Sequence, residues 1–191
     1  MVNAIATSIP PLTGPSGRWP ARYRKIQAPN ASDISPMKVN GKRTRGQSYN
    51  PDFVKVLIVG CGRVGSRLAA DMSREGHEVT IVDRNQRAFD LFATRGVLGP
   101  SFSGSFVIGD GCDSELLKRA GVEDADAFIA VTEGDNRNMM ASQIAYHVFK
   151  VKRVVCRLYD PAREDAFKNA GIQTYCPTLV GAAAIHKLVE E

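Results

Sequence analysis

Residues 56–72, "VLIVGCGRVGSRLAADM", decide the fold of this protein. The stretch begins with an apolar run, passes through three closely spaced glycines, and continues with apolar residues at helical spacing. A short continuous apolar run is typical of a strand that is buried on both faces of a parallel sheet. The stretch therefore predicts a buried strand, a tight turn and an amphipathic helix, which together form the first part of a βαβ unit.

The same alternation of apolar runs and helical stretches continues to the end of the chain. Strands are predicted near residues 54–59, 78–83, 105–108, 127–132, 153–158 and 173–175. Helices are predicted near residues 63–75, 85–94, 113–120, 135–149, 161–170 and 179–190. Gly76, Gly121 and Gly171 stand where a glycine commonly ends a helix. The predicted fold class is therefore α/β: a Rossmann-like, doubly wound parallel sheet of six strands with helices on both faces.

The composition is that of a soluble globular domain preceded by a basic arm. Of the 191 residues, 43% are hydrophobic and 24% are charged, and no window approaches the roughly 20 apolar residues of a membrane span. Residues 1–50 carry eight Lys or Arg against one acid, Asp33, and are rich in Pro, Ser, Asn and Gly. Such a segment buries too little apolar surface to fold. We therefore predict a disordered basic arm at 1–50 and one domain at 51–191.

The charges of the arm and the cysteines limit the classes of partner. The basic stretches 18–25 and 41–46 are typical of a solvated tail, and contact with nucleic acid or an anionic membrane surface is the less favoured alternative. The four cysteines have neither the spacing of a zinc site nor close pairs. We therefore predict no nucleic-acid partner, no metal site, no disulfide framework and a reducing cytosol.

The three glycines of the opening stretch form the pattern G-x-G-x-x-G at the predicted strand-to-helix turn. Gly60 permits the tight turn, Gly62 lets the main chain approach a pyrophosphate, and Gly65 lets helix and strand pack closely. The first-turn amides and the positive end of the helix dipole then face the phosphates. The pattern predicts a dinucleotide or another adenine nucleotide at this turn.

An acid follows at the distance that this kind of site requires. The second predicted strand ends in Asp83, about 20 residues after the glycines, where a carboxylate accepts both hydroxyls of an adenosine ribose. Asp83 would repel a 2′-phosphate, which favours NAD or an adenine nucleotide over NADP, whereas the neighbouring Arg84 weakens that preference. The alternative is that Asp83 only caps the second helix.

Further polar residues follow other strands of the predicted sheet. In a doubly wound sheet, ligands bind beyond the carboxyl ends of the strands. By that rule, Asp110 is placed to contact adenine or ribose, Thr132 a ribose or a phosphate, and Arg157 a phosphate. Their recurrence at one edge supports a single site there.

Each of these polar positions also has a simpler interpretation. Asp113 is placed to cap the third helix, and Asp135 and Asn136 are placed to cap the fourth. Arg157 has a nearby acid, Asp160, with which it would form an ion pair. Both interpretations stay open at the level of sequence.

No residue pattern predicts catalysis at this edge. His77 and His147 belong to the opposite edge of the sheet, and His186 lies in the terminal helix. A hydride-transfer enzyme usually needs an acid or base close to the reacting carbon. Cys61 and Cys112 lie in the predicted nucleotide loops, but a space-filling role is favoured over a redox role. We therefore predict no catalytic residue and no enzyme.

Three blocks of the sequence resemble one known family. They are "KVLIVGCGRVGSRLAADMSREGHEVTIVDRN", "GDGCDSELLKRAGVEDADAFIAVTEGDNRNMMAS" and "VVCRLYDPAREDAFKNAGIQTYCPT". In this order they are similar to the N-terminal domain of TrkA-type potassium-uptake regulators, the RCK or KTN domain, over about residues 53–185. The resemblance implies a Rossmann fold that binds NAD(H) or ATP/ADP without turnover. It also implies a homodimer or larger ring at the cytoplasmic face of an integral-membrane potassium transporter or channel.

The resemblance also implies the contact residues. Nucleotide contacts are expected at Gly60, Gly62, Arg63, Val64, Gly65, Asp83, Arg84, Asp110, Thr132 and Arg157. Asp135 and Asn138 match a D-x-x-N pattern that commonly helps to build the family's dimer.

Three departures bear on this expectation. Cys112 stands where Thr or Ala is common, and the loop at 94–104 is longer than usual, which leaves the choice of ligand open. Many members continue into a C-terminal ligand-binding domain, whereas the sequence stops at Glu191. The chain is then a piece of such a protein or a short form that works with a second subunit.

The function predicted is that of a nucleotide-sensing cytoplasmic regulatory subunit of a potassium uptake system, peripheral to the cell membrane through its partner. An NAD-dependent oxidoreductase, or the cofactor-binding half of one, is the alternative. Binding of nucleic acid by the basic arm ranks last and would be lost on deletion of residues 1–50.

Overall fold

The structure is a computed structural model, and it describes residues 54–94, 102, 104–167 and 171–190. The predicted basic arm at 1–50 and most of the long loop before the third strand lie outside these residues. The boundary between arm and domain stays a prediction.

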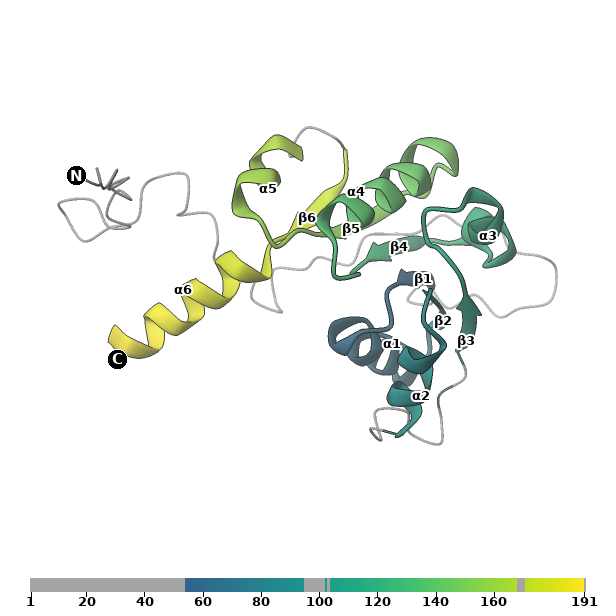
Figure 1. The fold of residues 1–191 in the computed structure, drawn as a ribbon, viewed down its shortest axis with the longest axis horizontal. Helices are drawn as coiled ribbons and strands as arrows, with labels where there is room; N and C mark the ends of the chain where they lie inside the picture. Colours follow the sequence, from purple (N-terminus) through teal and green to yellow (C-terminus); the bar gives the residue numbers. More distant parts are fainter. Residues whose placement is uncertain (1–53, 95–101, 103, 168–170, 191) are drawn as a thin grey trace, which may run out of the picture. The chain divides into compact units, whose positions relative to one another are not determined.

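The centre of the fold is a parallel sheet of six strands in the order β3-β2-β1-β4-β5-β6 (Figure 1). The strands are β1 (Lys55–Val59), β2 (Glu78–Asp83), β3 (Ser105–Ile108), β4 (Ala127–Ala130), β5 (Arg153–Arg157) and β6 (Gln173–Tyr175). The chain builds outward from β1 to β3 and then crosses back to add β4 on the other side of β1. This order is that of a doubly wound Rossmann sheet, as the alternating pattern predicted.

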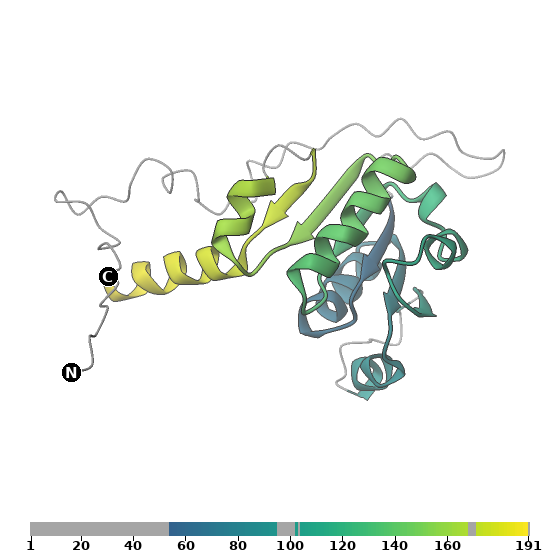
Figure 2. The same cartoon turned by 45° about the horizontal axis from the view of Figure 1, so that its top comes forward.

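Helices connect the strands and cover both faces of the sheet. They are α1 (Arg63–Arg74), α2 (Gln86–Thr94), α3 (Ser114–Arg119), α4 (Asp135–Gln143), α5 (Pro161–Phe167) and α6 (Pro177–Glu190). Along β1, Val56 and Ile58 pack into one core with residues of α1 and α2. Leu57 and Val59 face the other way and pack into a second core with residues of α3 and α4. Figure 2 shows α4 lying across β4 and β5.

Burial explains why the sequence of β1 is a continuous apolar run from residue 56 to residue 59. Ile58 pairs with Ile81 of β2 on one side and Ile129 of β4 on the other, so that β1 has no free edge. Each residue from 56 to 59 is at most 2% exposed. Both faces and both edges of β1 are therefore covered, and an apolar side chain is favoured at every position.

Two predicted helix ends are confirmed at glycines. Gly76 and Gly121 directly follow the last residues of α1 and α3 and their C-caps, and have φ angles of +88° and +84°, a left-handed conformation that a side chain disfavours. Gly171 has a φ of +72°, but residues 168–170 lie outside the described ones, so the end of the fifth helix at Gly171 stays a prediction. Asp113 caps α3 as expected, since its carboxylate accepts hydrogen bonds from the N–H groups of Glu115 and Leu116.

Two helical segments differ from the sequence prediction. The fourth helix does not continue regularly to 149 but passes into a π-helical segment, η2 (Ile144–Val148), in which the N–H of Phe149 reaches the carbonyl of Ile144 at 3.2 Å. A short 3₁₀ segment, η1 (Val122–Asp124), follows α3. Neither segment has a sequence signal, because both depend on how the end of a helix packs against the sheet.

The terminal helix α6 differs from the others in burial. None of its residues is buried, and Ile185, Leu188 and Val189 are 65%, 73% and 82% exposed. No helix within the described ranges has both the length and the apolar character needed to cross a membrane.

Candidate functional site

A cleft of about 900 Å³ opens at the carboxyl edge of the sheet. Its walls come from the ends of β1, β2, β4 and β5, so it spans the point between β1 and β4 at which the strand order reverses. Ligands of doubly wound sheets bind at this point. Eight of the ten predicted contact residues line the cleft: Gly60, Gly62, Arg63, Val64, Asp83, Arg84, Thr132 and Arg157.

The structure confirms the predicted structural roles of Gly60 and Gly65, whereas the approach of a pyrophosphate at Gly62 stays a prediction. Gly60 has a φ of +110°, and a Cβ there would lie 2.9 Å from the backbone N of Thr132. A Cβ on Gly65 would lie 1.9 Å from the carbonyl oxygen of Gly60, so this glycine serves close packing and does not line the cleft. A Cβ on Gly62 would meet nothing within 4 Å. At Gly62, therefore, the missing side chain leaves open space beside the cleft.

The N-terminus of α1 contributes positive potential at the turn. Its N-cap is Gly62, which has no side chain to accept the first-turn N–H groups, and its first turn contains no acid. The first hydrogen bond of the turn runs from the N–H of Ser66 to the carbonyl of Gly62 at 2.9 Å. The N–H groups of Arg63, Val64 and Gly65 precede it and have no partner within a helix. Such a helix end attracts a phosphate.

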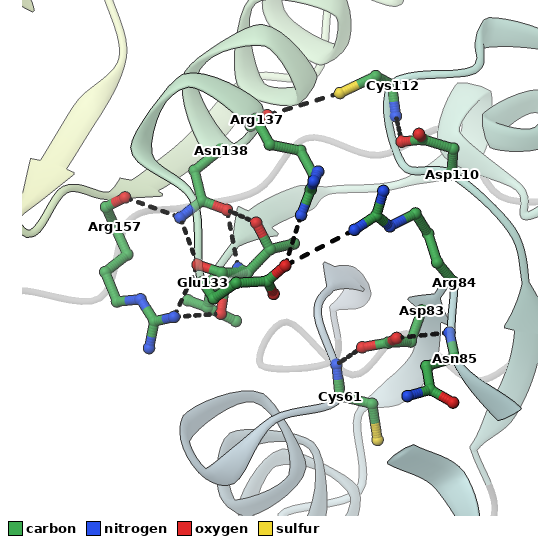
Figure 3. A network of polar contacts seen from close by, with 12 residues as sticks. Cys61, Asp83, Arg84, Asn85, Asp110, Cys112, Glu133, Arg137, Asn138 and Arg157 are labelled. Atoms are coloured by element: carbon green, nitrogen blue, oxygen red, sulfur yellow. Dashed lines mark hydrogen bonds and ion pairs between the residues drawn. The ribbon is translucent and has the colours of Figure 1, made fainter. Parts of the chain in front are cut away.

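Asp83 joins the glycine turn to the end of β2 (Figure 3). One carboxylate oxygen accepts the N–H of Cys61 at 2.7 Å, and the other accepts the N–H of Asn85 at 2.8 Å. The alternative of a helix cap is wrong, because Asn85 caps α2 by accepting the N–H of Arg87 at 3.0 Å. Asp83 thus holds the two loops that form one end of the cleft.

Arg157 brings a buried positive charge to the other side of the cleft. Its side chain is 7% exposed, and its Nη2 donates to the carbonyls of Val131 at 2.6 Å and Thr132 at 2.7 Å. The guanidinium lies 4.6 Å from the ring centroid of Tyr159. These contacts bind the guanidinium N–H groups but do not neutralise its charge.

The predicted alternative, an ion pair between Arg157 and Asp160, is not formed. Asp160 pairs instead with Arg163 at 3.6 Å. Among the residues that the structure describes, no carboxylate lies within ion-pair distance of Arg157, and its buried Nε has no hydrogen-bond partner. A buried cation without a counter-ion is costly, so this side of the cleft favours an anion.

Asn138 holds Thr132 and Arg157 in place. This side chain is fully buried, and its Oδ1 accepts from the N–H of Thr132 at 2.7 Å and from its hydroxyl at 2.6 Å. Its Nδ2 donates to the carbonyls of Thr132 and Arg157, both at 2.9 Å. Because the Thr132 N–H is bound to this side chain, β4 ends at Ala130 and not at 132 as predicted.

Asp135 also acts between elements and does not cap its own helix. Its carboxylate accepts the N–H groups of Tyr159 at 2.9 Å and Asp160 at 3.0 Å. The N-cap of α4 is Gly134, which makes no side-chain hydrogen bond, so the predicted cap by Asp135 or Asn136 is wrong. The D-x-x-N pattern therefore fixes α4 to the end of β5 within the chain, and its role in a dimer stays a prediction.

Sequence reasoning missed two charged residues of the cleft, Glu133 and Arg137. The Oε1 of Glu133 lies 2.7 Å from Nη1 of Arg137 and 3.6 Å from Nη2 of Arg84. The backbone N–H of Glu133 itself and the two arginines hold the pKa of its carboxyl below its usual range. The spacing of Glu133 and Arg137, four residues apart at the start of a helix, is the signal that would have pointed to this pair.

Asp110 does not line the cleft, although Gly109 and Gly111 do. Its carboxylate accepts the N–H of Cys112 at 3.0 Å and shapes the turn before α3. The contact of Asp110 with adenine or ribose is therefore still a prediction.

The two cysteines of the loops do not have the properties of reactive thiols. Cys61 is 4% exposed, and burial, with a smaller contribution from Asp83, raises its pKa to about 12. Burial also raises the pKa of Cys112. Because the thiolate is the reactive form, both environments favour the space-filling role.

The opposite edge of the sheet holds His77, as predicted, since this residue directly precedes β2. Of the residues described, no histidine lines the cleft, and no three His, Cys, Asp or Glu side chains gather as a metal site would require. The charged groups at the cleft are therefore arginines and carboxylates.

The sequence and the fold match a known domain family. The family model described as "TrkA-N domain" matches residues 56–177. The chain belongs to the TrkA-N domain family. The "Trk system potassium uptake protein TrkA" of Streptomyces coelicolor is 43% identical over 119 residues, which are 62% of this chain and 51% of that protein. A homolog of Methanothermobacter thermautotrophicus is 31% identical over 135 residues, 70% of this chain and 59% of that one. The chain thus spans about half the length of these curated relatives.

Solved structures show the same TrkA-N fold. The TrkA-N domain of the inner membrane protein ybaL from Escherichia coli has a TM-score of 0.60 at 18% identity, covering 72% of this chain and 98% of that one. The GsuK channel bound to NAD has a TM-score of 0.59 at 24% identity, covering 76% and 24%. GsuK bound to ADP gives a TM-score of 0.59 at 24% identity, covering 72% and 34%.

Proposed function

We propose that this chain is a nucleotide-sensing regulatory domain of a potassium uptake system, which binds NAD(H) or ATP/ADP in the cleft without turning it over. Its relatives are named as Trk potassium uptake proteins, and a channel with the same fold has been solved with NAD and with ADP. These names support the class of ligand, and the geometry of the cleft supports its place in this chain.

The observation that carries the proposal is the uncompensated charge at the cleft. Arg157, at the end of β5, is buried without a carboxylate partner among the described residues. The N-terminus of α1, which follows β1, presents N–H groups without a side-chain cap. Burying an unpaired charge costs several kcal/mol even after the protein relaxes. A phosphate in the cleft would supply the missing negative charge to both groups, so an anionic ligand fits this site better than a neutral one.

The residues present also fit the nucleoside part of the ligand. Each carboxylate oxygen of Asp83 accepts one backbone N–H, and a carboxylate oxygen has a second lone pair with which to accept a ribose hydroxyl. The open space at Gly62 gives the pyrophosphate access to the first turn of α1. Arg63, Val64, Thr132 and Arg84 complete the proposed contacts on the cleft wall.

We propose that the bound nucleotide acts as a signal and not as a reactant. A ligand shifts a conformational equilibrium only through its difference in affinity for the two states. Such a shift would be read by an integral-membrane potassium transporter or channel at the cytoplasmic face of the membrane. An oxidoreductase would need an acid or base beside the reacting carbon, and it would consume NADH in the presence of a suitable acceptor.

We further propose that the domain works as a homodimer or a larger ring. Ile185, Leu188 and Val189 of α6 lie exposed in the single chain. Water would be excluded from these side chains if a second copy packed against them, and apolar burial of this kind stabilises subunit contacts.

Calorimetric titration with NAD, NADH, ADP and ATP tests the binding proposal. We expect at least one to bind, and Gly62→Val to weaken that binding by about tenfold or more, or about 1.4 kcal/mol, because the new side chain fills the path of the phosphates. Gly181→Val in α6 is the matched control, since a Cβ there also meets nothing within 4 Å. Equal affinity of Gly62→Val and wild type would contradict the placement of the phosphates.

A further inference from the structure

Three charged side chains from two separate segments meet over the cleft (Figure 3). Arg84 follows β2, Glu133 lies between β4 and α4, and Arg137 lies in the first turns of α4. Both guanidinium groups approach the same atom, Oε1 of Glu133, at 2.7 Å from Arg137 and 3.6 Å from Arg84. Two cations from opposite walls of the cleft thus converge on a single oxygen.

The burial of the three groups is unequal. The side chain of Glu133 is 80% exposed, that of Arg84 51% and that of Arg137 28%. Among the described residues, the carboxylate is held by its two arginines and by its own backbone N–H. Exposed ion pairs of this kind contribute little to stability, so an incoming anion can displace Glu133 at low cost.

A phosphoryl oxygen has the same bonding requirements as the Glu133 carboxylate. Both are anionic acceptors, and guanidinium groups bind both through charge-assisted hydrogen bonds. Two positive charges surround one negative charge at this point, which leaves an excess of positive charge directed into the cleft. A phosphate that replaced Glu133 would bring more negative charge to the same two partners.

We propose that Arg84 and Arg137 form a phosphate-binding pair, and that Glu133 occupies this pair in the ligand-free chain as an internal competitor. The inference deepens the proposed function, because it adds a subsite to the same cleft. Glu133 then lowers the affinity for every ligand that carries a phosphate at this point. The loss is greater for a triphosphate than for a monophosphate, because the longer ligand has more charge with which to reach the pair.

The test compares Glu133→Gln with wild type by calorimetric titration with AMP, ATP and inorganic triphosphate. Removal of the competing charge is expected to tighten binding of ATP and inorganic triphosphate by about two- to fivefold, the range that exposed ion pairs support. Binding of AMP is expected to change less. Glu78→Gln is the matched control, because it removes the same charge from an exposed ion pair, that with Lys55, at the opposite edge of the sheet.

A second background separates competition for the arginines from simple repulsion of the ligand. In the Arg84→Gln/Arg137→Gln double variant, Glu133 no longer has the two arginines to bind. Glu133→Gln should then increase the affinity for ATP and inorganic triphosphate by no more than Glu78→Gln does. The inference is overturned if Glu133→Gln still tightens phosphate binding in this background. It is also overturned if, with both arginines present, Glu133→Gln and Glu78→Gln tighten binding equally.

Inorganic triphosphate keeps this inference separate from the proposed function. If no nucleotide binds but Glu133→Gln tightens the binding of triphosphate, the phosphate pair stands and nucleotide sensing fails. If nucleotides bind but Glu133→Gln leaves their affinities and that of triphosphate unchanged, the proposed function stands and the role of Glu133 as a competitor is contradicted.

Discussion

Asp83 shows how one side chain serves both the fold and the proposed site. Its two oxygens bind the N–H groups of Cys61 and Asn85, and these bonds connect the glycine turn to the loop after β2. Asp83 also lines the cleft, and each of its oxygens has a further lone pair with which to accept a hydrogen bond. Loss of this carboxylate would therefore remove a ribose acceptor and loosen both loops.

Asp83→Ala is expected to weaken nucleotide binding by about 1–3 kcal/mol, because hydrogen bonds to a charged acceptor are lost. Calorimetry measures the affinity, and circular dichroism confirms that the sheet is retained. Asp71→Ala is the control, since Asp71 bonds to exposed Arg67 and Arg74 on α1 outside the cleft. Unchanged affinity of Asp83→Ala would remove Asp83 from the site.

Residue-level expectations held where local chemistry alone sets the role. The tight turn at Gly60 and the close packing at Gly65 were predicted from spacing, and the close contacts that a Cβ would make at each position confirm them. The cap by Asp113 was also local and was confirmed. The partners of Arg157 were not predictable, because they lie just after β4, 25 and 26 residues away in sequence.

At the scale of elements, α4 has the largest effect on the site. It provides Arg137 to the cleft, and its buried Asn138 bonds to both Thr132 and Arg157. Asp135 at its start fixes the segment that follows β5. The position of α4 against the sheet therefore sets the distance between two walls of the cleft.

Asn138→Ala is expected to destabilise the domain by about 2–3 kcal/mol, because the Thr132 and Arg157 backbone groups lose their partner inside the core. Urea unfolding measures this loss. Nucleotide affinity should fall as well, since Thr132 and Arg157 are no longer held. Asn136→Ala is the control on the exposed side of the same helix, where Asn136 bonds to Arg163. An equal loss of stability in both variants would argue against a special role for Asn138.

The element boundaries followed the sequence closely except where a distant residue intervened. β4 stops two residues early because Asn138 binds the N–H of Thr132. The regular part of α4 ends at Gln143, where η2 begins. Apolar periodicity detects a buried face of a strand or helix. It does not detect a side chain that takes the place of a neighbouring strand as hydrogen-bond partner, and it does not detect the wider turn of a π-helix.

At the scale of the whole molecule, the main open surface in the described ranges is α6. This helix has no buried residue, whereas the faces of the sheet are covered by the other helices. Its apolar residues therefore contribute nothing to the core of the single chain. Their exposure supports the proposal that a second copy covers them.

Ile185→Glu/Leu188→Glu is expected to shift the protein from dimer to monomer, because charges at an apolar contact oppose its burial. Sedimentation velocity measures the oligomeric state. The unfolding midpoint of the isolated domain should change little, since both side chains are 65% or more exposed. A dimer that survives both substitutions would place the subunit contact elsewhere.

By itself, the sequence determined the class of fold and the edge of the sheet at which the cleft opens. Apolar runs, helical periodicity and capping glycines are local signals, because each depends on the burial or backbone conformation of a few neighbouring residues. Only the tertiary structure decided how the charges are distributed around the cleft. The buried Arg157 without a counter-ion, the Asn138 contacts and the shared Glu133 oxygen all join residues of separate elements. Electrostatic contacts of that kind arise from positions in space, which spacing along the chain does not record.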